Sequence, residues 1–106
     1  MTDGKITALE VQKRNKERVN VYIDGEFAFG LNMMDAAALR KGQILTPVEV
    51  TRLQHGDAVV KAVDAAANFL SYRPRSTTEV RRNLTKKYDP EVVEAAMQRL
   101  VDLNYL

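Results

Sequence analysis

The residues best suited to bind something form a cationic cluster in the second half of the chain. Glu79 is the only acid between positions 73 and 87, and six basic side chains surround it: Arg73, Arg75, Arg81, Arg82, Lys86 and Lys87. Arginine holds carboxylates and phosphates with two parallel hydrogen bonds. The pattern predicts a surface for an anionic partner, either acidic protein or nucleic acid. The alternative is a solvated helix face that binds nothing.

A turn between two helices must position these arginines. Pro74 cannot continue a helix and favours an extended conformation at Arg73. Ser76 lies three residues before Glu79, the spacing of a capping box at a helix start. We therefore expect a helix to end near Tyr72 and another to begin after Ser76. We expect three tyrosines at helix ends to cover the core, with base stacking as the alternative: Tyr72, Tyr88 and Tyr105.

A second basic cluster lies near the N-terminus, at a turn between two expected strands. It comprises Lys13, Arg14, Lys16 and Arg18. The pattern allows a contact with nucleic acid or protein. The stronger alternative is that charged residues here give solubility and prevent unwanted strand pairing.

The sequence shows no pattern typical of an enzyme. There is no cysteine, and His55 is the only histidine, so we expect no transition-metal site and a surface position for His55. No nucleophile lies beside a base, and the glycines are too widely spaced for a phosphate loop. We expect no catalysis and no cofactor.

The first third of the chain alternates apolar and polar residues with a period of two. Ile6 to Leu31 predicts a three-stranded antiparallel meander, with Asp24-Gly25 as the second turn. Helix-favouring residues from Met33 to Arg40, closed by Gly42, predict one short helix. A small sheet of this kind must pack against helices.

The rest of the chain has helical periodicity. Thr46 and Glu49 predict a capping box, and the helix after them either continues through His55-Gly56 or pauses there. Three short helices follow from position 57, the last beginning at Asp89-Pro90. The fold class is α+β: the meander with short helices over residues 1–54, then a three-helix bundle repeat over residues 55–106.

Composition fits one cytoplasmic protein without a membrane segment. The chain has 106 residues, 45% hydrophobic and 28% charged, which is typical of a folded domain. The net charge of +2 discriminates poorly among partners. No apolar run approaches the ~20 residues needed to span a bilayer. We expect a monomer, although no pattern decides the oligomeric state.

The C-terminal residues stay apolar, from Leu100 through Leu103 and Tyr105 to Leu106. We expect further residues to cover this end, as in a repeat protein whose stacked units bury each other's faces.

Several segments, in this order and spacing, resemble the N-terminal part of RecX, a family of regulators of the RecA recombinase. They are Ile6–Lys13, Val21–Gly30, Leu39–Gln43, Leu70–Ser76, Glu79–Arg81 and Leu100–Leu106. The resemblance implies a strand-rich extension followed by successive three-helix repeats, in a basic molecule that lies in the groove of the RecA–DNA filament. It also implies a role in recombination, DNA repair and the SOS response. Such proteins block filament growth and reduce ATP hydrolysis, strand exchange and coprotease activity.

This chain departs from the family in length. Only the extension and a first repeat are present, and the aspartate and Phe-Ala motif expected after Leu106 are absent. Two hypotheses follow: a RecA-filament regulator without enzymatic activity, and an autonomous DNA-binding module of the helix-turn-helix type. Acids at Glu91 and Glu94, where a recognition helix would read bases, weigh against the second.

Overall fold

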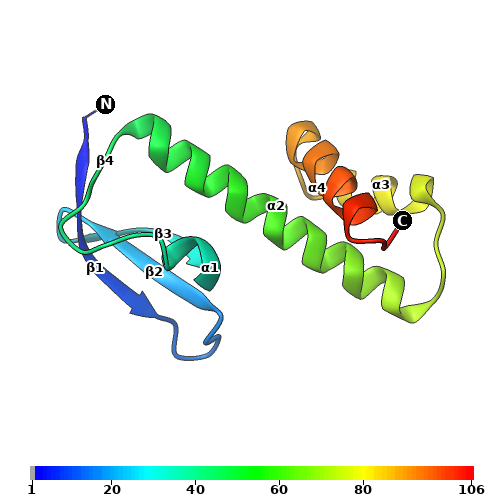
Figure 1. The fold of residues 1–106 in the computed structure, drawn as a ribbon, viewed down its shortest axis with the longest axis horizontal. Helices are drawn as coiled ribbons and strands as arrows, with labels where there is room; N and C mark the ends of the chain where they lie inside the picture. Colours follow the sequence, from blue (N-terminus) through cyan, green and yellow to red (C-terminus); the bar gives the residue numbers. More distant parts are fainter. Residues whose placement is uncertain (1) are drawn as a thin grey trace. The chain divides into compact units, whose positions relative to one another are not determined.

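A computed structural model describes residues 2–106 and confirms the α+β class (Figure 1). Strands dominate the first part of the chain and helices the second. The elements of these residues are β1 (Gly4–Val11), β2 (Arg18–Ile23), β3 (Glu26–Asn32), α1 (Met33–Ala36), β4 (Ile44–Leu45), α2 (Pro47–Tyr72), α3 (Thr77–Thr85) and α4 (Pro90–Asp102).

The sheet has one strand more than the sequence predicts. Its order is β3-β2-β1-β4, with antiparallel neighbours. The predicted turn between β2 and β3 is confirmed, because Asp24 and Gly25 have the positive φ angles, 52° and 85°, of a tight hairpin. The added strand β4 pairs Leu45 with Gly4 and Ile44 with Lys5. Two residues are too few to show a period of two, so the pattern misses this strand.

The helix predicted from Met33 to Arg40 is wrong in length, because α1 ends at Ala36. Asn32 caps its start by accepting a hydrogen bond from the N–H of Asp35. Beyond α1 the chain turns so that β4 can return to β1. Gly42 serves this turn: its φ is 92°, and its N–H donates to the carbonyl oxygen of Ile6 at 2.7 Å.

The chain divides into two compact units, Met1–Asp57 and Ala58–Leu106. The boundary predicted between residues 54 and 55 stays a prediction. In the first unit, one face of the sheet is buried with Ala36, and Val50 and Leu53 from the start of α2 pack against this core. Its other buried residues are Ile6, Val19, Val21, Phe29, Leu31 and Leu45.

Helix α2 runs without interruption through His55-Gly56, which decides between the two alternatives left open by the sequence. His55 is exposed, as predicted. In the second unit, the C-terminal part of α2 forms a three-helix core with α3 and α4 (Figure 1). Fully buried residues of this core include Ala62, Ala66, Val80, Ala96 and Leu100. Small alanine side chains allow close helix packing there.

The C-terminal turn exposes part of its apolar surface. Val101, Leu103 and Tyr105 are 48%, 54% and 51% exposed, whereas Leu106 packs against the core of the second unit. Asn104, with a φ of 65°, reverses the chain, and the N–H of Tyr105 donates to the carbonyl of Leu100 at 2.8 Å.

Candidate binding surfaces

The turn between α2 and α3 is held by the capping box that the sequence predicts. The Ser76 hydroxyl accepts a hydrogen bond from the N–H of Glu79, and the Glu79 carboxylate accepts one from the N–H of Ser76, each at 3.1 Å. A second predicted capping box, between Thr46 and Glu49, opens α2 with distances of 3.0 and 3.1 Å. Both helix starts are thereby fixed by local interactions.

Two of the predicted binding arginines fold back onto this turn. Arg73 forms a 2.9 Å ion pair with Glu79 and also donates to the carbonyl of Pro74 at 2.9 Å. The guanidinium of Arg75 lies 3.8 Å from the ring centroid of Phe69, a cation–π contact. The backbone hydrogen bond from Ser76, followed by that from Arg73, lowers the pKa of Glu79. Arg73 and Arg75 therefore stabilise the conformation of the turn, in addition to placing positive charge on its surface.

Arg81 has an acidic partner that the local sequence does not reveal. Its guanidinium pairs with the carboxylate of Glu94 on α4, and both side chains are exposed. The hydrogen bond from Arg81 lowers the pKa of Glu94 and raises that of Arg81. Glu79 is therefore not the only acid at this surface, and the charge of Arg81 is largely neutralised.

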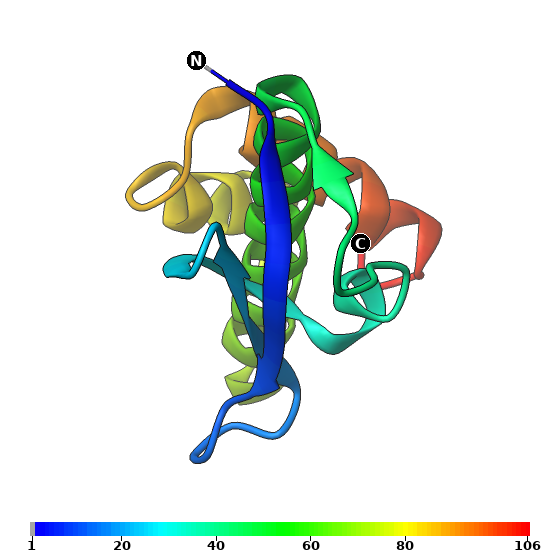
Figure 2. The ribbon, with the colours of Figure 1, turned by 90° about the vertical axis from the view of Figure 1, so that its left-hand side faces the viewer.

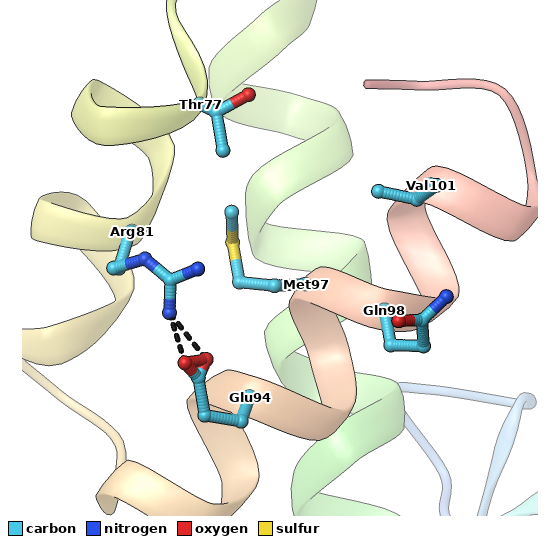
Figure 3. A pocket seen from close by; sticks show the side chains of 6 residues that line it. All are labelled: Thr77, Arg81, Glu94, Met97, Gln98 and Val101. Atoms are coloured by element: carbon cyan, nitrogen blue, oxygen red, sulfur yellow. Dashed lines mark hydrogen bonds and ion pairs between the residues drawn. The ribbon is translucent and has the colours of Figure 1, made fainter.

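The Arg81–Glu94 pair borders a small hollow between α3 and α4, of about 160 Å³ (Figure 3). The Met97 side chain points into it. The hollow is smaller than the about 300–1,000 Å³ typical of cofactor sites. Its other lining residues are Thr77, Gln98 and Val101.

The remaining three predicted cations lie at the C-terminal end of α3. Arg82, Lys86 and Lys87 are exposed, and none forms an ion pair within residues 2–106. Lys87 lies 5.9 Å from the ring centroid of Tyr88. Cations at a helix C-terminus also interact favourably with the negative end of the helix dipole, so these residues help to stabilise α3. We call these three residues the α3 cations.

The prediction that tyrosines cover the core is confirmed for Tyr88, which packs against the core of the second unit. It is wrong for Tyr72, whose residue is 76% exposed, and for Tyr105, which is half-exposed. Tyr72 ends α2 just before Pro74, where the chain leaves the helix, and nothing within residues 2–106 covers its ring. An exposed aromatic ring beside arginines is a favourable contact for a partner.

The N-terminal basic cluster separates into two parts. Arg18 turns inward and forms two hydrogen bonds of 2.9 Å with the carboxylate of Asp57. Lys13, Arg14 and Lys16 stay exposed and form no ion pair within residues 2–106. We call these three residues the hairpin tip.

Asp57 is a buried, paired acid that the sequence patterns do not predict. It is 5% exposed and also accepts hydrogen bonds from the N–H and side-chain amide of Asn32, at 2.9 and 3.2 Å. The available signal was its position: Asp57 follows Val50 and Leu53 by seven and four residues, so it lies on the buried face of α2. An acid on that face requires a cationic partner.

The described part of the chain offers no metal centre, because no group of three potential ligands occurs in residues 2–106. Nor does any helix in that range have the length and apolar character needed to cross a membrane.

Comparison with known proteins identifies what these two units are. The model described as "Regulatory protein RecX N-terminal domain" matches residues 4–46, and that described as "RecX, first three-helix domain" matches residues 62–100. A solved structure entitled "Crystal structure of regulatory protein RecX" is similar, with a TM-score of 0.79 and 28% identity. The match covers 94% of this chain and 50% of that one.

Curated proteins named "Regulatory protein RecX" agree. The relative from Listeria welshimeri is 36% identical over 105 residues, which is 96% of this chain and 39% of the relative. That from Bacillus subtilis is 39% identical over 104 residues, 95% of this chain and 39% of the relative. That from Staphylococcus saprophyticus is 43% identical over 106 residues, 92% of this chain and 39% of the relative.

The matches define a regulatory protein with a strand-rich domain followed by a three-helix domain. The chain belongs to the RecX family, as its sequence motifs predict. It spans about two fifths of the length of the curated relatives it matches.

Proposed function

We propose that this chain docks on RecA filaments and lowers RecA ATPase, strand-exchange and coprotease activity. Membership of a family of regulatory proteins supports a protein partner. The observation that carries the proposal is the set of α3 cations, which are exposed and have no ion pair within residues 2–106. The filament offers them acidic protein surface and DNA phosphate.

The fold supports this role because it holds Arg82 on an ordered helix and Lys86 and Lys87 in the turn that ends this helix. The capping box fixes the start of α3, and buried Val80 and Leu84 hold its inner face. The backbone of this surface is therefore already ordered before a partner binds, which lowers the entropy cost of binding. Complementary charge mainly sets the rate and orientation of encounter, while packed contacts such as an exposed tyrosine slow dissociation.

The test measures two quantities on RecA filaments formed on single-stranded DNA: co-sedimentation of the chain and the rate of ATP hydrolysis. We expect the chain to co-sediment and the ATPase rate to fall as it is added. The triple variant Arg82→Glu, Lys86→Glu, Lys87→Glu should bind at least about tenfold more weakly, a loss of about 1.4 kcal/mol. The control reverses three exposed cations of the first unit: Arg40→Glu, Lys41→Glu and Arg52→Glu.

The outcomes separate the parts of the proposal. If the chain does not co-sediment with the filaments even at a saturating concentration, docking is overturned. If the two triple variants lose the same amount of binding affinity, the role of the α3 cations is overturned. Co-sedimentation with an unchanged ATPase rate overturns the inhibitory part and keeps the docking.

The alternative of an autonomous helix-turn-helix module has less support. Helix α4 would be the recognition helix, yet Glu91 and Glu94 lie exposed in its first turns and would repel phosphates. Glu94 also neutralises Arg81.

A further inference from the structure

The turn between β1 and β2 is a closed loop stabilised by its own backbone. The N–H of Gln12 donates to the carbonyl of Arg18 at 2.9 Å, and the N–H of Arg18 donates to the carbonyl of Asn15 at 3.1 Å. Inside the loop, the side chain of Asn15 accepts a hydrogen bond from the N–H of Glu17 at 3.0 Å. These bonds give the loop one defined conformation.

The base of this loop is anchored to the rest of the first unit. The carbonyl of Glu17 accepts a 2.8 Å hydrogen bond from the N–H of Met33. Arg18 is fixed by its two bonds to Asp57 on α2. Arg18 thus serves as the anchor of the cluster, not as part of its exposed surface.

The anchored loop presents three cations to solvent. The turn projects beyond the end of the sheet (Figure 2), and the hairpin-tip residues Lys13, Arg14 and Lys16 are all exposed on it. Residues 12 to 17 include no apolar side chain, and the only acid among them, Glu17, forms no ion pair within residues 2–106.

We propose that the hairpin tip binds the phosphate backbone of nucleic acid. Phosphate contacts need positive charge in a defined place and no apolar anchor, which matches this loop. A protein contact of comparable strength would need a packed aromatic or aliphatic residue, and residues 12 to 17 have none. Lysine in particular binds phosphate as a point charge without strict geometry. This site is distinct from the α3 cations and does not depend on binding to RecA.

The test uses the whole chain without RecA and two probes, a fluorescent oligo(dT) strand and a mixed-sequence DNA duplex of the same length. Affinity is measured by anisotropy between 50 and 200 mM salt for the wild type and for the triple variant Lys13→Gln, Arg14→Gln, Lys16→Gln. Three single-strand contacts contribute about −2 to the log–log salt slope, or about 20-fold in affinity over this range. On the duplex the contribution is about −2.7. A control variant carries Arg40→Gln, Lys41→Gln and Arg52→Gln, which change the net charge equally.

We expect the log–log salt slope of the hairpin-tip variant to be shallower than that of the wild type by most of this contribution, on at least one probe. The slope of the control variant should change much less. The probe that responds identifies the form of nucleic acid. Equal losses in both variants overturn the site, because they show only an effect of net charge. An unchanged slope also overturns it. If the tip variant instead weakens binding to RecA without DNA, the tip is a protein contact and the inference is wrong.

Discussion

The guanidinium of Arg18 and the carboxylate of Asp57 face each other fork to fork, with two hydrogen bonds of 2.9 Å between residues 39 positions apart. This pair joins the start of β2 to the middle of α2. Because Asp57 is buried, removing one partner leaves a charge in a site of low polarity.

We predict that Asp57→Asn lowers the free energy of unfolding by about 2–4 kcal/mol, somewhat less than for a fully buried pair because Arg18 keeps some contact with water. The amide oxygen of the new residue can still accept the hydrogen bonds from Asn32, whereas the charged contact with Arg18 is lost. Urea unfolding measures it. The double variant with Arg18→Met should cost less than the sum of the two single changes, and strict additivity would show that the pair is not coupled.

The same pair predicts a pH dependence of stability. Burial raises the pKa of Asp57, but the hydrogen bonds from Arg18 and Asn32 and the charge of Arg18 outweigh it, so the pKa lies below its ordinary value of 3.8. A lowered pKa in the folded state means that the stabilisation is complete above about pH 4 and is lost as the pH falls further. Thermal unfolding from pH 7 to pH 2 measures the effect. Asp57→Asn should flatten the acid limb more than Glu94→Gln, whose pair is exposed.

Two glycines should respond oppositely to replacement by alanine. A Cβ added at Gly4 would lie 2.3 Å from Cγ2 of Ile23, so Gly4→Ala must push the Ile23 side chain on the neighbouring strand out of place and should cost about 1–3 kcal/mol. At Gly56, inside α2, an added Cβ would lie 3.7 Å from Oδ2 of Asp35, an ordinary van der Waals contact. Gly56→Ala should therefore stabilise the chain by up to about 1 kcal/mol through helix propensity. Urea unfolding measures both effects. If the unfolding midpoints of the two variants shift in the same direction, the prediction is contradicted.

Tyr72 should matter for binding and little for folding. Because the residue is 76% exposed, Tyr72→Ala should change the free energy of unfolding by no more than about 0.5 kcal/mol. If Tyr72 contacts the filament, the same change should weaken co-sedimentation with RecA about fivefold or more, since exposed tyrosines are frequent binding hot spots.

Tyr72→Phe and Tyr88→Ala serve as controls for this prediction. The first keeps the ring and should retain most of the binding. The second removes a ring that packs against the core and should lower stability. Wild-type co-sedimentation by Tyr72→Ala would exclude the ring from the interface.

Much of the fold could be predicted because its signals are local. The capping boxes at Thr46 and Ser76 join residues three positions apart, and Asp24-Gly25 closes a two-residue turn. Such features depend on backbone preferences and short-range hydrogen bonds, which neighbouring residues specify. Signals were absent where an element was very short, as in β4, or where the chain had to turn for tertiary reasons, as after Ala36.

The sequence by itself determined where the basic residues gather, where the helices begin, and the likeness to RecX, since all three are properties of residue type and spacing. Only the tertiary structure decided which cations are available. It brought Asp57 to Arg18 and Glu94 to Arg81, and it left the hairpin tip and the α3 cations without an ion pair within residues 2–106. The physical reason is that a charge is neutralised by whatever lies near it in space, and the acids that approach these arginines come from other secondary-structure elements.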